Sequence, residues 1–227
     1  MLMRVAAGVL ALGLLAGCGS KDDDKAEEKE SAKPSPSATT EAPASYYDVP
    51  FGVTLTEPGT QLALGAEGVI AFERRQKEIG VLSVKVERIE RTSFQESFAG
   101  WNVDDVTAAR TPYFVRLTVT NLGDTDLGGL KLDNVIWAND GTTLEAPNQY
   151  TKAQLPACAG DPLPASFLKA ATAQICQVYF IAPARTLETI SFIPPAGLDP
   201  VTWAGEISKV EKPVKKKPKK KPSQEAT

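Results

Sequence analysis

Residues 112–124 read Pro-Tyr-Phe-Val-Arg-Leu-Thr-Val-Thr-Asn-Leu-Gly-Asp and alternate in hydrophobicity. The apolar residues at 113, 115, 117 and 119 share one side of a period-2 pattern, and Arg116, Thr118 and Thr120 share the other. Asn121 and Gly123 then supply residue types that tolerate a turn. The stretch therefore predicts a half-buried central strand of an antiparallel sheet, ended by a turn.

Other stretches carry β-strand signals and are separated by turn residues. Residues 81–91 alternate until Arg88 and Ile89, where the pattern changes face and indicates a β-bulge. Residues 174–183 are apolar on both sides, which predicts a strand buried on both faces, and Asp140-Gly141 predicts a hairpin turn. Residues 92–110 predict a long crossover with a helical turn. The further strands are expected at 61–65, 69–72, 134–138 and 187–193, and together these elements predict an antiparallel β-sandwich.

The first 18 residues resemble the export signal of a bacterial lipoprotein. Arg4 gives a positive start, and residues 5–15 form an apolar run too short to span a bilayer stably. Leu15-Ala16-Gly17-Cys18 resembles a lipobox, which implies that residues 1–17 are removed and that Cys18 is acylated. Two acyl chains such as palmitate suffice for membrane attachment. The alternatives are an ordinary secretory signal that happens to contain a cysteine and a lone buried helix.

Composition divides the rest of the chain into a tether, one domain and a tail. Residues 18–45 follow the signal as a polar tether, predicted to be disordered and to reach about 30 Å. Residues 46–208 are enough for one domain with a core. Residues 209–227 hold eight lysines interrupted by prolines, which predicts a disordered tail. The domain has 12 Lys and Arg against 19 Asp and Glu, whereas the tail has 8 against 2, so the net charge of −3 combines an acidic domain with a basic tail.

The basic tail predicts contact with anionic wall polymers or lipid headgroups. The candidate contact residues are Lys215, Lys216, Lys217, Lys219, Lys220 and Lys221. A solubilising tail that pairs loosely with the acidic part of the chain is the alternative. Nucleic acid is not expected as a partner, because no aromatic residues are interleaved with the lysines and the expected compartment is extracellular.

Cysteine and histidine counts restrict the chemistry. Cys158 and Cys176 form an even pair in an exported chain once Cys18 is acylated, so a disulfide is expected, with roughly 3 kcal/mol of loop-closure stabilisation. A redox or metal pair is the alternative, but Cys-x-x-Cys spacing is absent. The chain has no histidine, so Ser-His-Asp and Cys-His catalysis is excluded. No metal or other cofactor is expected.

Five segments resemble, in their order, a family of immunoglobulin-like domains of unknown function. The family is common in Gram-positive extracellular lipoproteins, and the mycobacterial immunoprotective extracellular protein is similar to it. The resemblance covers roughly residues 50–195 and implies an all-β, immunoglobulin-like antiparallel β-sandwich without catalytic residues to carry over. This chain departs from the pattern at 92–110, at 155–167 and in its tail, where any individual function is expected. The matching segments are 59–65, 81–91, 113–124, 139–141 and 178–183.

These features predict a non-enzymatic, lipid-anchored binding or interaction module on the extracellular face of a Gram-positive-type cell membrane. Its expected partners are the membrane, through the anchor, and another envelope protein or an anionic wall polymer. Retention by the basic tail alone is one alternative. A carboxylate-dependent hydrolase is another, because two acids across a cleft can hydrolyse a glycosidic bond. Its candidate acids are Asp104, Asp105, Asp133 and Asp161, although solvation and turn formation explain these carboxylates as well.

Overall fold

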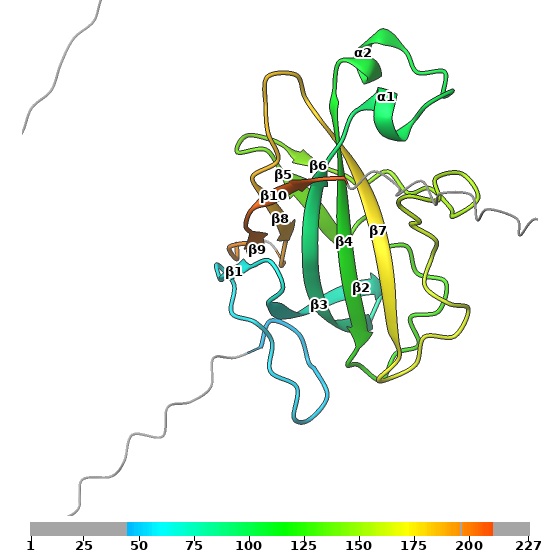
Figure 1. The fold of residues 1–227 in the computed structure, drawn as a ribbon. Helices are drawn as coiled ribbons and strands as arrows, with labels where there is room; N and C mark the ends of the chain where they lie inside the picture. Colours follow the sequence, from blue (N-terminus) through cyan, green and yellow to red (C-terminus); the bar gives the residue numbers. More distant parts are fainter. Residues whose placement is uncertain (1–44, 196, 211–227) are drawn as a thin grey trace, which may run out of the picture. The chain divides into compact units, whose positions relative to one another are not determined.

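The computed structural model describes residues 45–195 and 197–210, which form a β-sandwich of two packed sheets (Figure 1). Sheet A runs in the order β1 (Gln61–Ala63), β9 (Val201–Ala204), β8 (Thr189–Phe192), β5 (Ile136–Asn139) and β6 (Leu144–Glu145). Sheet B runs in the order β10 (Ile207–Lys209), β3 (Glu78–Arg91), β4 (Thr111–Asn121) and β7 (Thr172–Ile181), and β2 (Glu67–Arg75) also pairs with β3. The predicted β-sandwich is therefore confirmed.

The pairing is antiparallel in most of the sandwich, but β1 with β9 and β10 with β3 pair in parallel. These two short pairs are the parallel exceptions within the predicted antiparallel sandwich. Each is only three residues long and joins segments far apart in the sequence, so no hairpin signal could mark it. The Asp140-Gly141 turn does join β5 and β6 as an antiparallel hairpin.

The central strands carry the predicted two-sided pattern. On β4, the apolar residues Tyr113 and Val115 lie in the main core between the sheets, whereas Phe114 lies in a second cluster on the outer face of sheet B. On β7, Tyr179 belongs to the main core and Val178 to the outer cluster. Both faces of β7 are therefore buried, as the sequence indicates.

A β-bulge at Glu87 changes the face on which the side chains of β3 lie. Val86 pairs with Leu117 and Arg88 with Arg116, so Glu87 is an extra residue in β3. Val86 and Ile89 both lie in the main core, although strict alternation would put them on opposite faces. The predicted bulge is confirmed, and it directs Arg88 and Glu90 to the outer face of sheet B.

The end of the domain differs from the sequence-based expectation. Val201 and Trp203 of β9, for which no strand was predicted, are both fully buried in the main core. Gly68 makes room for the indole, because a Cβ there would lie 2.6 Å from Trp203 Cζ2. Lys209, expected to start the tail, is the last residue of β10, because that short segment pairs with the end of β3.

Asn121 closes the turn that follows β4. Its side chain is fully buried, and Nδ2 donates hydrogen bonds to the carbonyl oxygens of Thr125 and Phe167, each at 2.8 Å. Its Oδ1 accepts a hydrogen bond of 2.9 Å from the backbone N–H of Gly123. One side chain thus satisfies backbone groups of the turn and of the segment before β7, which explains why an asparagine ends this strand.

We expect Asn121→Ala to reduce the free energy of unfolding by about 2–4 kcal/mol, because it leaves buried backbone groups without partners. Urea denaturation of the full chain measures the change. Asn102→Ala, at an exposed position, is the control and should change stability by less than about 0.5 kcal/mol. Equal stability of the two variants would contradict this role for Asn121.

Candidate site on the outer face of sheet B

Two segments cover one end of the outer face of sheet B. The first contains α1 (Phe94–Ser97) and α2 (Asp105–Ala108), and the second is the loop 148–160. Their aromatic rings pack on each other and on the sheet, as in the Phe98–Phe114 contact with centroids 6.0 Å apart and the Trp101–Tyr150 contact at 4.9 Å. Burial raises the pKa of the Tyr150 hydroxyl. The expected crossover with a helical turn is therefore present, and it forms an aromatic cap.

The two short helices of this cap begin with capping side chains. Ser93 accepts a hydrogen bond from the backbone N–H of Glu96, which is a Ser-x-x-Glu capping signal that our sequence analysis missed. Asp104 accepts one of 2.8 Å from the N–H of Thr107, and this bond lowers the pKa of the Asp104 carboxyl. Helix capping accounts for Asp104, one of the candidate hydrolase acids.

The other candidate acids lie in separate parts of the domain. Asp105 is the first residue of α2, and Asp161 accepts a hydrogen bond of 3.2 Å from the backbone N–H of Lys152. Asp133 lines a hollow beside β2 that also contains Arg74. The contacts of these carboxylates therefore lie in separate segments of the described chain.

A disulfide joins Cys158 in the loop 148–160 to Cys176 in β7, as the sequence predicts, with the two Cα atoms 5.0 Å apart. We call this segment the disulfide loop. Both cysteines are buried. The loop also bonds to the free edge of β7, since the N–H of Cys176 donates to the carbonyl oxygen of Ala159 at 3.0 Å and Asn148 bridges to Val178. The loop therefore protects an edge strand and is held in a fixed position over the sheet.

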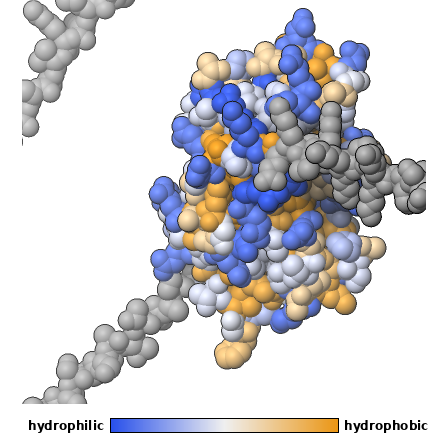
Figure 2. Space-filling view, viewed as in Figure 1, coloured by the Kyte–Doolittle hydropathy of each residue, from blue (hydrophilic) through white to orange (hydrophobic). Residues whose placement is uncertain are grey.

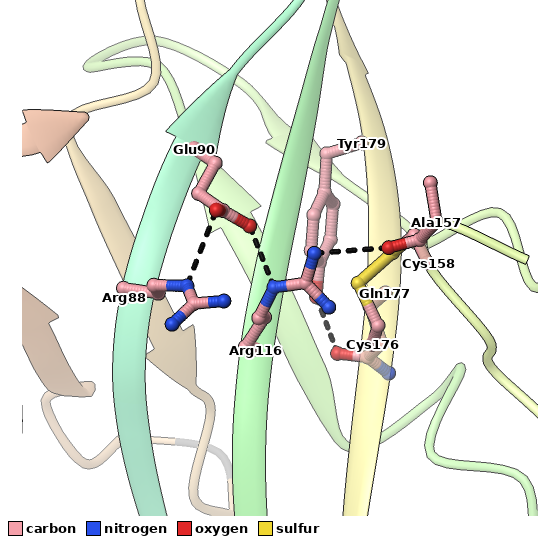
Figure 3. Close-up of a disulfide and its surroundings, with 8 residues drawn as sticks. All are labelled: Arg88, Glu90, Arg116, Ala157, Cys158, Cys176, Gln177 and Tyr179. Carbon is pink, nitrogen blue, oxygen red and sulfur yellow. Dashed lines mark hydrogen bonds and ion pairs between the residues drawn. A yellow bond between two sulfur atoms is a disulfide. The ribbon is translucent and has the colours of Figure 1, made fainter. Parts of the chain in front are cut away.

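A buried carboxylate holds two arginines beside this loop (Figure 3). The side chain of Glu90 is only 5% exposed; its Oε2 lies 2.6 Å from Arg116 Nε and its Oε1 lies 3.2 Å from Arg88 Nε. Arg116 Nη2 also donates a hydrogen bond of 2.9 Å to the carbonyl oxygen of Ala157 in the disulfide loop. A buried charge needs such partners, and here they fix both guanidinium groups in place.

The two arginines line a hollow of about 500 Å³ between the sheet and the disulfide loop, which we call the arginine hollow. Hydrophilic residues lie over the middle of this face in Figure 2. The lining residues come from β3, β4, β7 and the loop, and they are Glu87, Arg88, Arg116, Leu117, Thr118, Pro156, Ala159, Gln174, Ile175 and Cys176. The arginine hollow therefore lies next to the aromatic cap.

Glu87, the bulge residue, is held in its charged form. The Lys85 ammonium lies 3.0 Å from Glu87 Oε1 and is the main reason why the pKa of this carboxyl is below its ordinary value. The Thr118 hydroxyl also donates a hydrogen bond of 2.9 Å to Glu87 Oε1. Glu87 can therefore accept hydrogen bonds from a molecule in the hollow, but its negative charge is already paired.

Arg88, Glu90 and Arg116 were not predicted as site residues from the sequence. The available signal was the change of face at Arg88, which marks a bulge, and bulges often redirect side chains at sites. The lipidation residue Cys18 and the six tail lysines, from Lys215 to Lys221, lie outside the described residues. Cys158, Cys176 and the four candidate acids are the predicted site residues that the structure describes.

The described ranges contain no group of three or more His, Cys, Asp or Glu residues arranged to hold a metal ion. Neither helix in the described part of the chain has the length and hydrophobicity needed to cross a membrane.

Comparison with known proteins finds no matching family model and no matching curated protein. Three solved structures are similar at low identity. A secreted protein from Mycobacterium tuberculosis, MPT63, is 12% identical over 64% of this chain and 96% of its own, with a TM-score of 0.42. An uncharacterised β-sandwich protein from Clostridium difficile is 9% identical over 69% of this chain and 99% of its own, with a TM-score of 0.38.

The third structure is ycdA of Bacillus subtilis, named as a candidate lipoprotein. It is 13% identical over 54% of this chain and 35% of its own, with a TM-score of 0.37. A secreted protein and a candidate lipoprotein are thus among the structures that this chain resembles. At these levels the likenesses assign no activity, and membership of the immunoglobulin-like family stays a prediction.

We expect Glu90→Gln to lower the free energy of unfolding by about 1–3 kcal/mol, since it removes the negative charge that two arginines share and places an amide NH2 group against one of them. The value lies below that for a fully buried ion pair because the Arg116 side chain is 30% exposed and that of Arg88 is 56% exposed. Chemical denaturation measures the loss. Glu206→Gln, which changes the same charge at an exposed position, should be neutral; if both variants unfold alike, Glu90 does not organise this site.

Proposed function

We propose that the protein is a lipid-anchored, extracellular binding module, and that the arginine hollow is its contact site. The observation that carries the proposal is the buried Glu90 carboxylate, which fixes Arg88 and Arg116 at the wall of the hollow. Arginines held in one orientation lose little conformational entropy when they bind a ligand. A fixed, polar hollow beside a rigid loop is suited to recognition.

Carboxyl chemistry favours binding over hydrolysis. A general acid of a glycosidase needs a raised pKa, which burial in apolar surroundings usually supplies. Among the described carboxyl groups with a resolved shift, the pKa values of Glu87, Asp104, Asp126 and Asp140 are all lowered by hydrogen bonds. These groups are ordered as acceptors in turns, caps and ion pairs, which supports a module without catalysis.

Motifs near the two ends of the sequence support the proposed location at the cell envelope. The lipobox at Cys18 supports attachment to the extracellular face of the membrane, and the polar segment up to residue 45 supports a spacer between lipid and domain. Retention by anionic wall polymers through the tail is the second candidate, supported by the eight lysines from 209 to 221. A third, carboxylate-dependent hydrolysis, has no assembled pair of acids to support it.

Cell fractionation tests the location. The wild-type chain should sediment with membranes and Cys18→Ser should be released into the medium, because only the first can be acylated. Deleting 211–227 from the wild-type chain should leave membrane attachment unchanged. If Cys18→Ser stays in the envelope at low salt and the tail deletion releases it, retention belongs to the tail and the anchor is wrong.

A blocking substitution tests the contact site. Gln174 lies at an exposed position of β7 in the lining of the hollow, so Gln174→Trp should fill the space without disturbing the core. In the full chain with Cys18→Ser, we expect this change to reduce binding to isolated cell envelopes at least tenfold. Gln61→Trp, at an exposed glutamine of β1 in sheet A, is the matched control. Equal binding by both variants, or turnover of a wall polymer that one carboxylate substitution abolishes, would overturn the proposal.

A further inference from the structure

We infer that the arginine hollow binds a phosphodiester flanked by hydroxyl groups, of the glycerol-phosphate type. This inference rests on the proposed function and specifies its ligand. It follows from the charge of the hollow, from the hydrogen-bonding groups left for a ligand, and from the size of the space.

The charge of the hollow selects an anion with one negative charge. Arg88, Arg116 and Glu87 line the hollow, and Lys85 and Glu90 pair with these residues from beside it. Three positive charges therefore face two negative ones, and one positive charge is in excess. A neutral sugar would leave this charge unpaired. A phosphate monoester carries about −1.5 to −2 at neutral pH and would overcompensate it close to two carboxylates. A diester carries one charge and matches it.

The arginines have donors available for the oxygens of such an anion. Arg88 contacts Glu90 through Nε, and within the described part of the chain its Nη1 and Nη2 form no hydrogen bond. Arg116 uses Nε and Nη2 for Glu90 and Ala157, and its Nη1 has no partner among the described residues. The two guanidinium groups come from paired positions of β3 and β4 and lie side by side (Figure 3). Each can therefore donate to a different oxygen of one phosphodiester.

The rest of the lining offers hydrogen-bond acceptors, which favour hydroxyl groups on the ligand. Thr118 donates its hydroxyl proton to Glu87, so both side chains are left with acceptor sites, and Gln174 adds an amide. A ligand ammonium is disfavoured, because Lys85 already pairs with the Glu87 carboxylate. Neutral donors beside the anion, such as the hydroxyls of a polyol, fit these acceptors best.

The size of the hollow favours a group within a chain over a terminal group. About 500 Å³ is several times the space that a single oxyanion needs, and the lining continues along β4 and β7 beyond the arginines. A phosphodiester has two ester arms that can follow this surface on both sides of the charge. A carboxylate is attached to its molecule through one carbon, so the molecule extends from the charge in one direction only.

Isothermal titration calorimetry with glycerophosphoglycerol tests the inference, using the full chain with Cys18→Ser at 150 mM salt to screen the tail. We expect Arg88→Gln to weaken binding about tenfold, as for the loss of a charged hydrogen bond. Arg116 keeps its bond to Glu90 in this variant, and a thermal melt checks that the domain is folded. Arg91→Gln, which makes the same charge change on β3 outside the hollow, should bind within about twofold of the parent chain.

Glycerol 3-phosphate and glucuronate provide the competing chemistries, a monoester and a carboxylate. Either of them binding as tightly as the diester, or equal losses in Arg88→Gln and Arg91→Gln, would overturn the inference. If Arg88→Gln does not fold, Gln174→Trp serves as the second variant, and diester binding that survives it also overturns the inference.

Sedimentation with phosphatidylglycerol vesicles distinguishes the two sources of the diester. Vesicle binding that Arg88→Gln weakens assigns it to a lipid headgroup, whereas binding of the soluble diester alone assigns it to a wall polymer. Envelope binding that Gln174→Trp abolishes, without any diester binding, would remove this inference and leave the proposed function standing. If Gln174→Trp leaves envelope binding unchanged and no diester binding is detected, both this inference and the proposed function are overturned.

Discussion

The bulge at Glu87 is the constraint on which the outer face of sheet B depends. Without the extra residue, the alternation of Val84 and Val86 would continue and turn Arg88 and Glu90 toward the apolar core. Burial of both charges there would cost far more than one bulge. The bulge instead places Ile89 in the core, pairs Arg88 with Arg116, and leaves the Glu90 side chain on the outer face, where it reaches Arg116. It also divides the edge of β3, which pairs with β2 up to Lys85 and with β10 from Ile89.

Covering the outer face then fixes where a ligand can bind. The aromatic cap and the disulfide loop bury one end of the face and protect the edge of β7, while the polar strand residues at the other end stay accessible. Glu90 lies at the boundary between these regions. Its carboxylate is shielded from water there, and its charge is compensated by two arginines. Those arginines reach far enough into solvent to meet another molecule. The same burial that stabilises the cap therefore orders the groups of the hollow.

Local patterns in the sequence were enough to predict much of the fold. The alternation in β4, the two-sided pattern of β7, the change of face at Arg88 and the Asp140-Gly141 hairpin are all properties of neighbouring residues. The parallel pairing of β9 with β1 and of β10 with β3 was not predictable. Strands of three or four residues carry little periodicity, and the partners lie more than a hundred residues apart in the sequence. Trp203 illustrates this, since its burial depends on the distant Gly68.

The hollow was harder to predict because it depends on register between strands. Arg116 was assigned to the polar side of its strand, but nothing local indicates that Glu90, 26 residues earlier, accepts its hydrogen bond. The disulfide loop contributes the carbonyl oxygen of Ala157, which accepts a hydrogen bond from Arg116. A backbone group of this kind cannot be predicted from a pattern of side chains. The candidates that we chose from the sequence were carboxylates, and contacts with the backbone explain two of them: Asp104 caps α2, and Asp161 accepts a hydrogen bond from the N–H of Lys152.

The uneven charge of the chain gives the tail and the hollow different parts in the proposed function. An anionic ligand is repelled by a domain with 12 basic and 19 acidic residues, but this repulsion is screened beyond about 8 Å at physiological salt. The tail lysines can raise the local concentration of any polyanion, and they do so without regard to its chemistry. Fixed donors and paired carboxylates discriminate only after contact. In the proposed function, specificity therefore comes from the hollow, where one excess positive charge beside paired acceptors would distinguish a diester from more highly charged groups.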